Sequence, residues 1–216
     1  MKILYEDKDI IIIDKPVGIL SQSDGKGSEN CEDKLNAYIK DKGEKGNVHL
    51  IHRLDRNVGG VMVFAKNRAA AASLSAQIQN KTFIKEYRAL VHSKPEEDEG
   101  VFDDLLFKDS RKNKTFVVNR MRKGVKDAKL SYKVLETCDS KYGEVSLVHI
   151  RLYTGRTHQI RVQFASRKMP LVGDGKYGGS DNGADIGLHS YRLTFVHPRT
   201  KHEVVFESEE NFLNRD

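Results

Sequence analysis

The stretch "HRLDRNVGGVMVFAK", residues 52–66, joins a charged loop to an apolar run of strand-like character. It places Asp55 between Arg53 and Arg56, and two glycines stand directly before the apolar run. Apolar residues flank the carboxylate, so we expect Asp55 to be partly buried. A buried carboxylate needs a partner, because burial alone raises its pKa. The two glycines favour a tight turn into the strand, or a bulge at its entry.

The segments outward from this stretch predict more strands than helices. Ser28 or Asn30 can cap a first helix, Asn67 caps a second over Arg68 to Gln79, and Thr157 caps a third. Other strands are expected within residues 3–16 and over 61–65, 85–92, 115–118, 129–135, 145–152, 188–198 and 202–208. Because strands cluster without regular alternation with helices, the fold class is α+β, with a mixed, mainly antiparallel sheet and a few flanking helices. We expect a single domain over 1–216, with a basic hairpin or insertion around 94–129.

Positive charge is concentrated in one segment. The 216 residues carry a net charge of +6, and Lys108 to Lys129 alone contribute nine Lys or Arg against two Asp, a net +7. The rest of the chain therefore sums to −1. A local basic patch favours a surface that follows phosphates, and the alternative is a solvated, lysine-rich hairpin.

Several classes of site are excluded by spacing. The segment "GDGKYGG", residues 173–179, lacks P-loop spacing, and no HExxH, GxSxG or complete kinase motif set occurs. Cys31 and Cys138 form no CxxC pair, so we expect no metal site and a reducing, cytoplasmic location. The longest aliphatic run is four isoleucines, and the charged start does not resemble a signal peptide, so we expect no membrane segment.

A second segment, "TGRTHQIR" at residues 154–161, places Arg161 in the first turn of the third helix. A cation is disfavoured at a helix N-terminus unless a carboxylate faces it. A pair of Asp55 with Arg161 would satisfy both side chains and keep the carboxylate ionised as a nucleophile. The residues alone leave the alternative open that Asp55 caps a turn and that Arg161 lies on the surface.

Taken together, the motifs resemble those of the RluA-type pseudouridine synthases. The matching segments, in family order from about Glu6 to Phe206, are "EDKDIIIIDKPVG", "HRLD", "KEY", "VKDAKLSYKVLE", "TGRTHQIRVQF", "GDGKYGG" and "LHSYRLTFVHP". The resemblance implies an RNA-binding cleft across the sheet and isomerisation of a uridine in structured RNA, ribosomal or transfer, without cofactor or metal. It implies that Asp55 is the catalytic residue, that Arg161 pairs with it and that Tyr87 packs on the target base. Arg53 would fill the space that a flipped base leaves.

We expect further RNA contacts from basic residues near these motifs and in the basic segment: Arg56, Arg156, His158, Lys112, Lys114, Arg120, Arg122 and Lys123. The chain departs from the family pattern at Val58-Gly59-Gly60, where relatives usually carry Thr-Ser-Gly. This change affects the expected local geometry rather than the expected activity. Recognition of the RNA is expected from the catalytic domain, its insertions or another protein.

Two other functions remain open on the sequence. One is a catalytically inactive RNA-binding or ribosome-assembly protein on the same fold, and the other is a nucleoside-directed glycosidase, which would need a second acid. The presence of Asp55, Tyr87 and Arg161 together favours the isomerase. We expect a monomer without an obligate protein partner, and the sequence does not identify the RNA.

Overall fold

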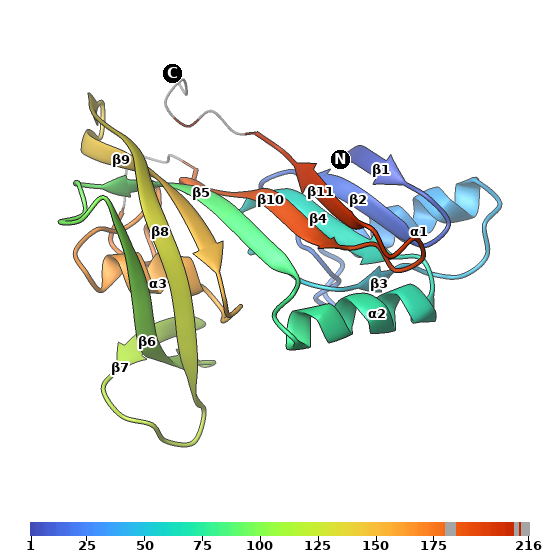
Figure 1. Ribbon diagram of the computed structural model, residues 1–216, viewed down its shortest axis with the longest axis horizontal. Coiled ribbons are helices and arrows are strands. Elements are labelled where there is room, and N and C mark those ends of the chain that lie inside the picture. Colours follow the sequence, from blue (N-terminus) through green and yellow to red (C-terminus); the bar gives the residue numbers. More distant parts are fainter. Residues whose placement is uncertain (180–184, 210–211, 213–216) are drawn as a thin grey trace. The chain divides into compact units, whose positions relative to one another are not determined.

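The computed structural model describes residues 1–179, 185–209 and 212, and the chain divides into two compact units. The first comprises Met1–Lys85 and Ser190–Glu210. The second comprises Glu86–His189 and the described part of Asn211–Asp216. Figure 1 labels their strands and helices.

The first unit is a sheet with two helices. Its strands follow the order β1-β2-β4-β10, with β11 beside β10 and β3 beside β4. β1 pairs antiparallel with β2, β2 and β3 with β4, and β10 with β11. The elements are β1 (Lys2–Glu6), β2 (Ile10–Lys15), α1 (Cys31–Asp41), β3 (His49–Leu50), β4 (Gly59–Ala65), α2 (Arg68–Gln79), β10 (Leu188–Val196), whose first two residues lie in the second unit, and β11 (Glu203–Glu207).

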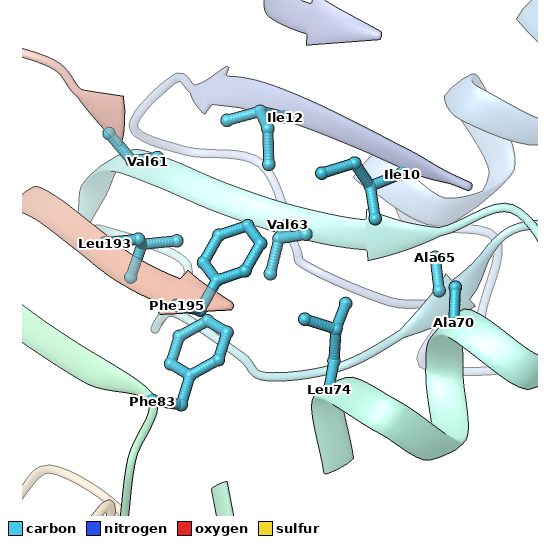
Figure 2. Close-up of a cluster of buried hydrophobic side chains, with 10 residues drawn as sticks. All are labelled: Ile10, Ile12, Val61, Val63, Ala65, Ala70, Leu74, Phe83, Leu193 and Phe195. Carbon is cyan, nitrogen blue, oxygen red and sulfur yellow. The ribbon is translucent and has the colours of Figure 1, made fainter. Parts of the chain in front are cut away.

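Helix α2 begins where the sequence predicts. The Asn67 side chain accepts a hydrogen bond from the Ala70 N–H at 2.9 Å, which satisfies one of the backbone donors that a helix start leaves unpaired. Leu74 of α2 is fully buried in a core with Ile10 of β2 and Val63 of β4, as Figure 2 shows. Burial of this apolar stripe attaches the helix to the sheet.

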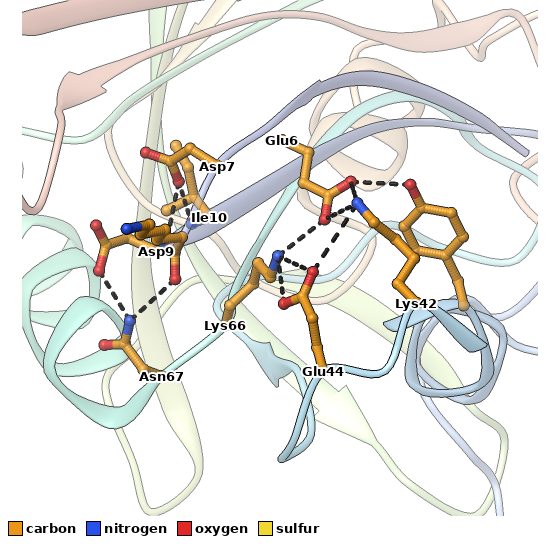
Figure 3. Close-up of polar contacts among 10 residues, drawn as sticks. Glu6, Asp7, Asp9, Ile10, Lys42, Glu44, Lys66 and Asn67 are labelled. Carbon is orange, nitrogen blue, oxygen red and sulfur yellow. Dashed lines mark hydrogen bonds and ion pairs between the residues drawn. The ribbon is translucent and has the colours of Figure 1, made fainter. Parts of the chain in front are cut away.

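An ion-pair cluster ties α1 to the same sheet. Glu6, at the end of β1, accepts hydrogen bonds from the Tyr38 hydroxyl at 2.9 Å and from the Lys42 ammonium at 3.0 Å. Lys66, just after β4, pairs with the same carboxylate at 2.8 Å and with Glu44 at 2.7 Å (Figure 3). Three segments of the first unit therefore meet at one carboxylate.

The second unit is an antiparallel sheet of long strands with one short helix. The strands follow the order β5-β9-β8-β6-β7, and the pairs β8–β9, β6–β8 and β6–β7 are antiparallel. The elements are β5 (Ile84–His92), whose first two residues belong to the first unit, β6 (Glu99–Asp109), β7 (Lys114–Val118), β8 (Val125–Ser140), β9 (Gly143–Leu152) and α3 (Gln159–Ala165).

The predicted cap of α3 is wrong. The helix begins one residue later than expected, and His158 rather than Thr157 occupies the N-cap, in the left-handed region with φ of 53°. The His158 side chain makes no cap bond, and the Thr157 carbonyl instead accepts from the Thr115 hydroxyl at 3.0 Å. Thr157 is therefore bound through its carbonyl to β7 and does not act as the cap that the sequence favoured.

The predicted α+β class with a mainly antiparallel sheet is confirmed. The segment 94–129 contributes the β6–β7 hairpin to the second unit. Among the helices that the structure describes, none is both long and apolar enough to cross a membrane.

Candidate active site

Asp55 lies half-buried on a loop whose backbone is fastened at several points. The Ser21 hydroxyl accepts from the Leu54 N–H at 3.0 Å and donates to the Leu54 carbonyl at 2.8 Å. The Val58 N–H donates to the Asp55 carbonyl at 3.0 Å and closes a turn. The chain on both sides of the carboxylate is therefore fixed by hydrogen bonds. The Arg53 side chain is exposed to solvent and the Leu54 side chain is buried, as expected for neighbouring residues in an extended loop.

A buried lysine also binds the backbone of this loop. The Lys15 side chain is 1% exposed, and its ammonium donates to the carbonyls of Pro16, Ile19 and Arg56 at 3.0, 2.7 and 3.2 Å. Burial lowers the pKa of Lys15 to about 8, and the nearby Asp55 carboxylate acts in the opposite direction. At neutral pH Lys15 is therefore mainly a cation, and its charge is buried beside the Asp55 loop.

Arg56 adds positive charge to the loop and also binds it to Gly18. Its Nε donates to the Gly18 carbonyl at 2.8 Å, and the Gly18 N–H donates to the Arg56 carbonyl at 2.9 Å. Most of Arg56 is nevertheless exposed, as is Arg53. One arginine is therefore partly engaged in holding the loop, and the other reaches solvent.

Gly60, the second residue of β4, is required for a steric reason. Gly60 has φ of 113°, and a Cβ built on it would lie 2.3 Å from the Ser190 carbonyl oxygen of β10. Any side chain at this position would push β10 away from β4. The tight entry into the strand, predicted from Gly59 and Gly60, is therefore needed for strand pairing in the first unit.

His52, the first residue of HRLD, is buried as a neutral imidazole. Its Nε2 accepts a hydrogen bond from the Val63 N–H of β4 at 3.3 Å, so its proton resides on Nδ1. Burial, together with the charge of Lys85, lowers the pKa of His52 to about 3. His52 therefore attaches the loop to the strand and takes no part in proton transfer near neutral pH.

In the second unit, Arg161 is buried in a bidentate ion pair with Asp174. Its Nε lies 2.7 Å from Oδ2 and its Nη2 lies 2.8 Å from Oδ1. Arg161 is 6% exposed, and Asp174 is completely buried. The carboxylate that Arg161 was expected to require is thus present, and Asp174 supplies it. The predicted pairing of Arg161 with Asp55 stays a prediction.

Tyr87 lies on β5 and is 6% exposed. Its strand belongs to the second unit from Glu86 onward, so Tyr87 and Arg161 are parts of the same unit. A buried aromatic ring on a regular strand has a fixed position, as a group that packs on a base would need.

The basic residues expected to contact RNA differ in exposure. Lys112, Arg120, Arg122 and Lys123 are exposed around the β6–β7 hairpin and the following loop, and Lys114 is half-buried. Arg156 donates through Nε to the Asp127 carbonyl at 2.7 Å, and His158 Nδ1 lies 2.9 Å from the Tyr177 hydroxyl. The last two therefore have structural contacts in addition to their predicted role.

Asp174 is the site residue that sequence reasoning missed. It lies in the segment "GDGKYGG", which stood out in the sequence only as a family-like motif without P-loop spacing. The sequence could have indicated it, because Arg161 near a helix N-terminus needs a carboxylate partner and Asp174 is an acidic residue in a neighbouring motif. Within the described residues, no cluster of three or more His, Cys, Asp or Glu is arranged to hold a metal ion.

Comparison with known proteins places the chain in a family. A family model described as RNA pseudouridylate synthase matches residues 9–166, which include Asp55, Tyr87 and Arg161. The chain belongs to this family. Members of the RNA pseudouridylate synthase family are isomerases that convert uridine to pseudouridine, so the predicted RluA-type resemblance and enzyme class are confirmed.

Curated relatives support the same assignment over nearly the whole chain. An uncharacterised RNA pseudouridine synthase of Aquifex aeolicus is 37% identical, over 97% of this chain and 69% of its own length. The ribosomal large subunit pseudouridine synthase D of Nitrosomonas europaea is 35% identical, over 96% of this chain and 61% of its own length.

A solved structure agrees with the fold. The human RNA pseudouridylate synthase domain containing 4 superposes with a TM-score of 0.80 at 24% identity, over 98% of this chain and 89% of that chain. The pseudouridylate synthase fold therefore extends across the chain.

Proposed function

We propose that this pseudouridine synthase uses the Asp55 carboxylate as a nucleophile on one uridine of a structured RNA. The observation that supports the proposal is that hydrogen bonds fix the backbone of the Asp55 loop. Leu54 and Arg56, on either side of the carboxylate, are bound through backbone atoms by Ser21 and Lys15. A nucleophile must be held in place before the reaction, because positioning supplies much of the rate.

The reaction replaces the N1–C1′ bond with a C5–C1′ bond and exchanges a proton at C5 for one at N1. The bond between uracil N1 and the sugar C1′ breaks, the uracil turns, and C5 bonds to C1′. The hydrogen on C5 leaves as a proton, and N1 gains a proton, so the product is an isomer of the substrate. Asp55 acts either at the sugar carbon or on the base, and both routes need it ionised.

The other predicted residues take distinct roles in this proposal. Tyr87 packs on the uracil while it is detached and assists removal of the C5 proton. Arg161 pairs with Asp55 and keeps it ionised. Exposed Arg53 occupies the space that the flipped uridine leaves, which offsets part of the unstacking cost of a few kcal/mol.

We infer that the RNA is bound mainly by the β6–β7 hairpin. Arg111 and Lys112 between its strands are exposed and Lys114 is half-buried. Phe116 is 37% exposed, and its ring centroid lies 6.0 Å from the Lys114 ammonium. Exposed rings beside cations suit a base that stacks while phosphates are neutralised. Relatives that are named ribosomal large subunit pseudouridine synthases favour a ribosomal RNA over a transfer RNA.

The test is release of tritium from RNA that carries the label at C5 of uridine. Wild type is compared with Asp55→Asn and with Asp41→Asn, which makes the same chemical change at an exposed aspartate of the first unit. Wild type and Asp41→Asn are expected to release label to water, and Asp55→Asn is expected to lose at least about 10³-fold in rate.

The same assay separates the alternatives. RNA binding without release by any of the three proteins would indicate an inactive binding protein. Free uracil as the product would indicate a glycosidase. Release by Asp55→Asn at the wild-type rate would contradict the role of Asp55.

A further inference from the structure

The segment Leu171–Gly179 closes on itself around the Asp174 backbone. The Asp174 carbonyl accepts hydrogen bonds from the N–H groups of Tyr177, Gly178 and Gly179 at 2.9, 3.1 and 3.0 Å. A Cβ on Gly179 would lie 1.9 Å from the Leu171 carbonyl oxygen, so only glycine permits this closure. The turn is therefore compact, and its one carboxylate is directed inward.

The turn is also anchored to the strand that carries Tyr87. The Val172 N–H donates to the Leu90 carbonyl of β5 at 3.0 Å, and the His92 N–H donates to the Pro170 carbonyl at 3.0 Å. The Asp174 carboxylate thus has a fixed position relative to β5. An arginine bound to it in bidentate fashion has both its location and its plane determined.

Tyr177 contacts Arg161 from a second direction. Its ring centroid lies 5.2 Å from the Arg161 guanidinium carbon and 5.0 Å from the Lys114 ammonium of β7. Its hydroxyl accepts from the Thr115 N–H at 2.8 Å and lies 2.9 Å from His158 Nδ1, at the start of α3. Burial raises the pKa of the Tyr177 phenol, so the hydroxyl keeps its proton at neutral pH.

We propose that Asp174 and Tyr177 are positioning residues that hold the Arg161 guanidinium in its reactive place and connect it to the RNA-contacting β6–β7 hairpin. The proposal rests on the function proposed above for Arg161. Neither residue touches the uridine. Asp174 fixes the position and plane of the guanidinium, and Tyr177 covers it while binding β7 and the start of α3.

The chain contains a matched control for Asp174. Asp104 on β6 forms a second bidentate pair in the same unit, with Arg167 just beyond α3, at 2.9 and 3.1 Å. Asp104→Asn removes the same charge as Asp174→Asn from an arginine–carboxylate pair that has no part in the proposed chemistry.

The experiment compares single-turnover tritium release at saturating RNA with the Kd for the same RNA. Asp174→Asn is expected to lose about 10²-fold in rate and Tyr177→Phe about tenfold, because small displacements of a catalytic group have effects of this size. Kd is expected to stay within about twofold of wild type for both variants. Asp104→Asn is expected to match wild type in the single-turnover rate.

Chemical rescue avoids dependence on the folding of Asp174→Asn. Free guanidinium ion at tens of millimolar is expected to restore part of the activity of Arg161→Ala, at least about tenfold, because Asp174 binds it in place of the side chain. The double variant Arg161→Ala/Asp174→Asn is expected to show no rescue. Equal rescue in both backgrounds would overturn the proposal.

The remaining outcomes are also decisive. Wild-type rates for both Asp174→Asn and Tyr177→Phe, with Arg161→Met inactive, would overturn this proposal and leave the proposed function intact. A loss of rate matched by an equal loss of RNA affinity, or by an equal loss in Asp104→Asn, would also overturn it. Wild-type activity in Arg161→Met would instead contradict the proposed function.

Discussion

His52 carries no charge at neutral pH, although it stands beside Arg53 in the sequence. Its imidazole is buried and accepts a backbone hydrogen bond from β4, and its pKa is lowered to about 3 by burial and by the charge of Lys85. Its Nδ1 has no hydrogen-bond partner among the residues that the structure describes. The HRLD motif therefore combines a buried anchor, a half-buried acid and an exposed arginine in four positions.

This burial predicts a pH dependence of stability. Below pH 6.5 the unfolded state binds a proton at His52, whereas the folded state does so only near pH 3. The free energy of unfolding should therefore fall as the pH decreases from 6.5 to about 3, by up to about 5 kcal/mol from this residue. His52→Gln, whose amide oxygen can also accept from Val63, should lose that part of the slope in urea titrations.

The matched control is His202→Gln, which changes an exposed histidine of the same unit. It should retain the wild-type slope. If His52→Gln and His202→Gln showed the same pH dependence, the neutral, buried state of His52 would be wrong.

At the scale of elements, the cluster around Glu6 joins β1, α1 and the segment after β4. Burial raises the pKa of Glu6, but hydrogen bonds from Lys66, Lys42 and Tyr38 outweigh it and lower the pKa to about 2. The unfolded carboxyl titrates near 4.5, so the stability that the cluster provides is present above that pH. It is lost as the pH falls from about 4.5 to about 2.

Lys66→Met should remove the central cation of this cluster. We expect it to lower the free energy of unfolding at pH 7 by about 1 kcal/mol, since the pair is only partly shielded from solvent. The difference from wild type should shrink as Glu6 becomes protonated, so it should be smallest near pH 2. A difference that did not change between pH 7 and pH 2 would mean that the lost packing of the side chain, rather than its charge, was responsible.

Elements with local signals were predicted well from the sequence. The Asn67 cap and the bounds of α2 agree with the structure, because both depend on contacts within the helix and on one apolar stripe. The antiparallel β10–β11 pair was likewise visible as two apolar runs joined by a turn. Local periodicity determines such elements, and tertiary contacts only reinforce them.

Elements shaped by distant contacts were predicted less well. The strand expected over residues 129–135 extends over Val125–Ser140 as β8, since a register shift between Val134 and Glu136 interrupts its alternation. β6 was not predicted as a strand. Asp174 was missed for a related reason. Its segment is rich in glycine and has the composition of a turn, so the ion pair of Asp174 with Arg161 could be recognised only in the structure.

At the scale of the whole molecule, charge is distributed unevenly along the chain. The segment from Lys108 to Lys129 carries more than the entire net charge. Counterion release makes RNA affinity fall with salt in proportion to the number of phosphates neutralised. The proposed interface therefore has a measurable electrostatic signature.

The triple variant Arg120→Ala/Arg122→Ala/Lys123→Ala should weaken RNA binding and reduce the slope of log Kd against log salt by about 2 to 3. The single-turnover rate at saturating RNA should change little, because these residues lie outside the proposed chemistry. Lys26→Ala/Lys40→Ala/Lys45→Ala removes the same charge from exposed positions of the first unit and serves as the control. Equal slopes for the two triple variants would show that net charge, and not the basic loop between β7 and β8, determines binding.

The central claim is that Asp55 meets Arg161 at the target uridine. The most direct measurement is a crystal structure of the protein bound to an RNA that contains that uridine. We predict an Asp55 carboxylate oxygen within about 4 Å of an Arg161 guanidinium nitrogen, with the flipped uridine against Asp55 and Tyr87. A bound uridine whose nearest carboxylate is not Asp55, with Asp55 and Arg161 apart, would contradict the account.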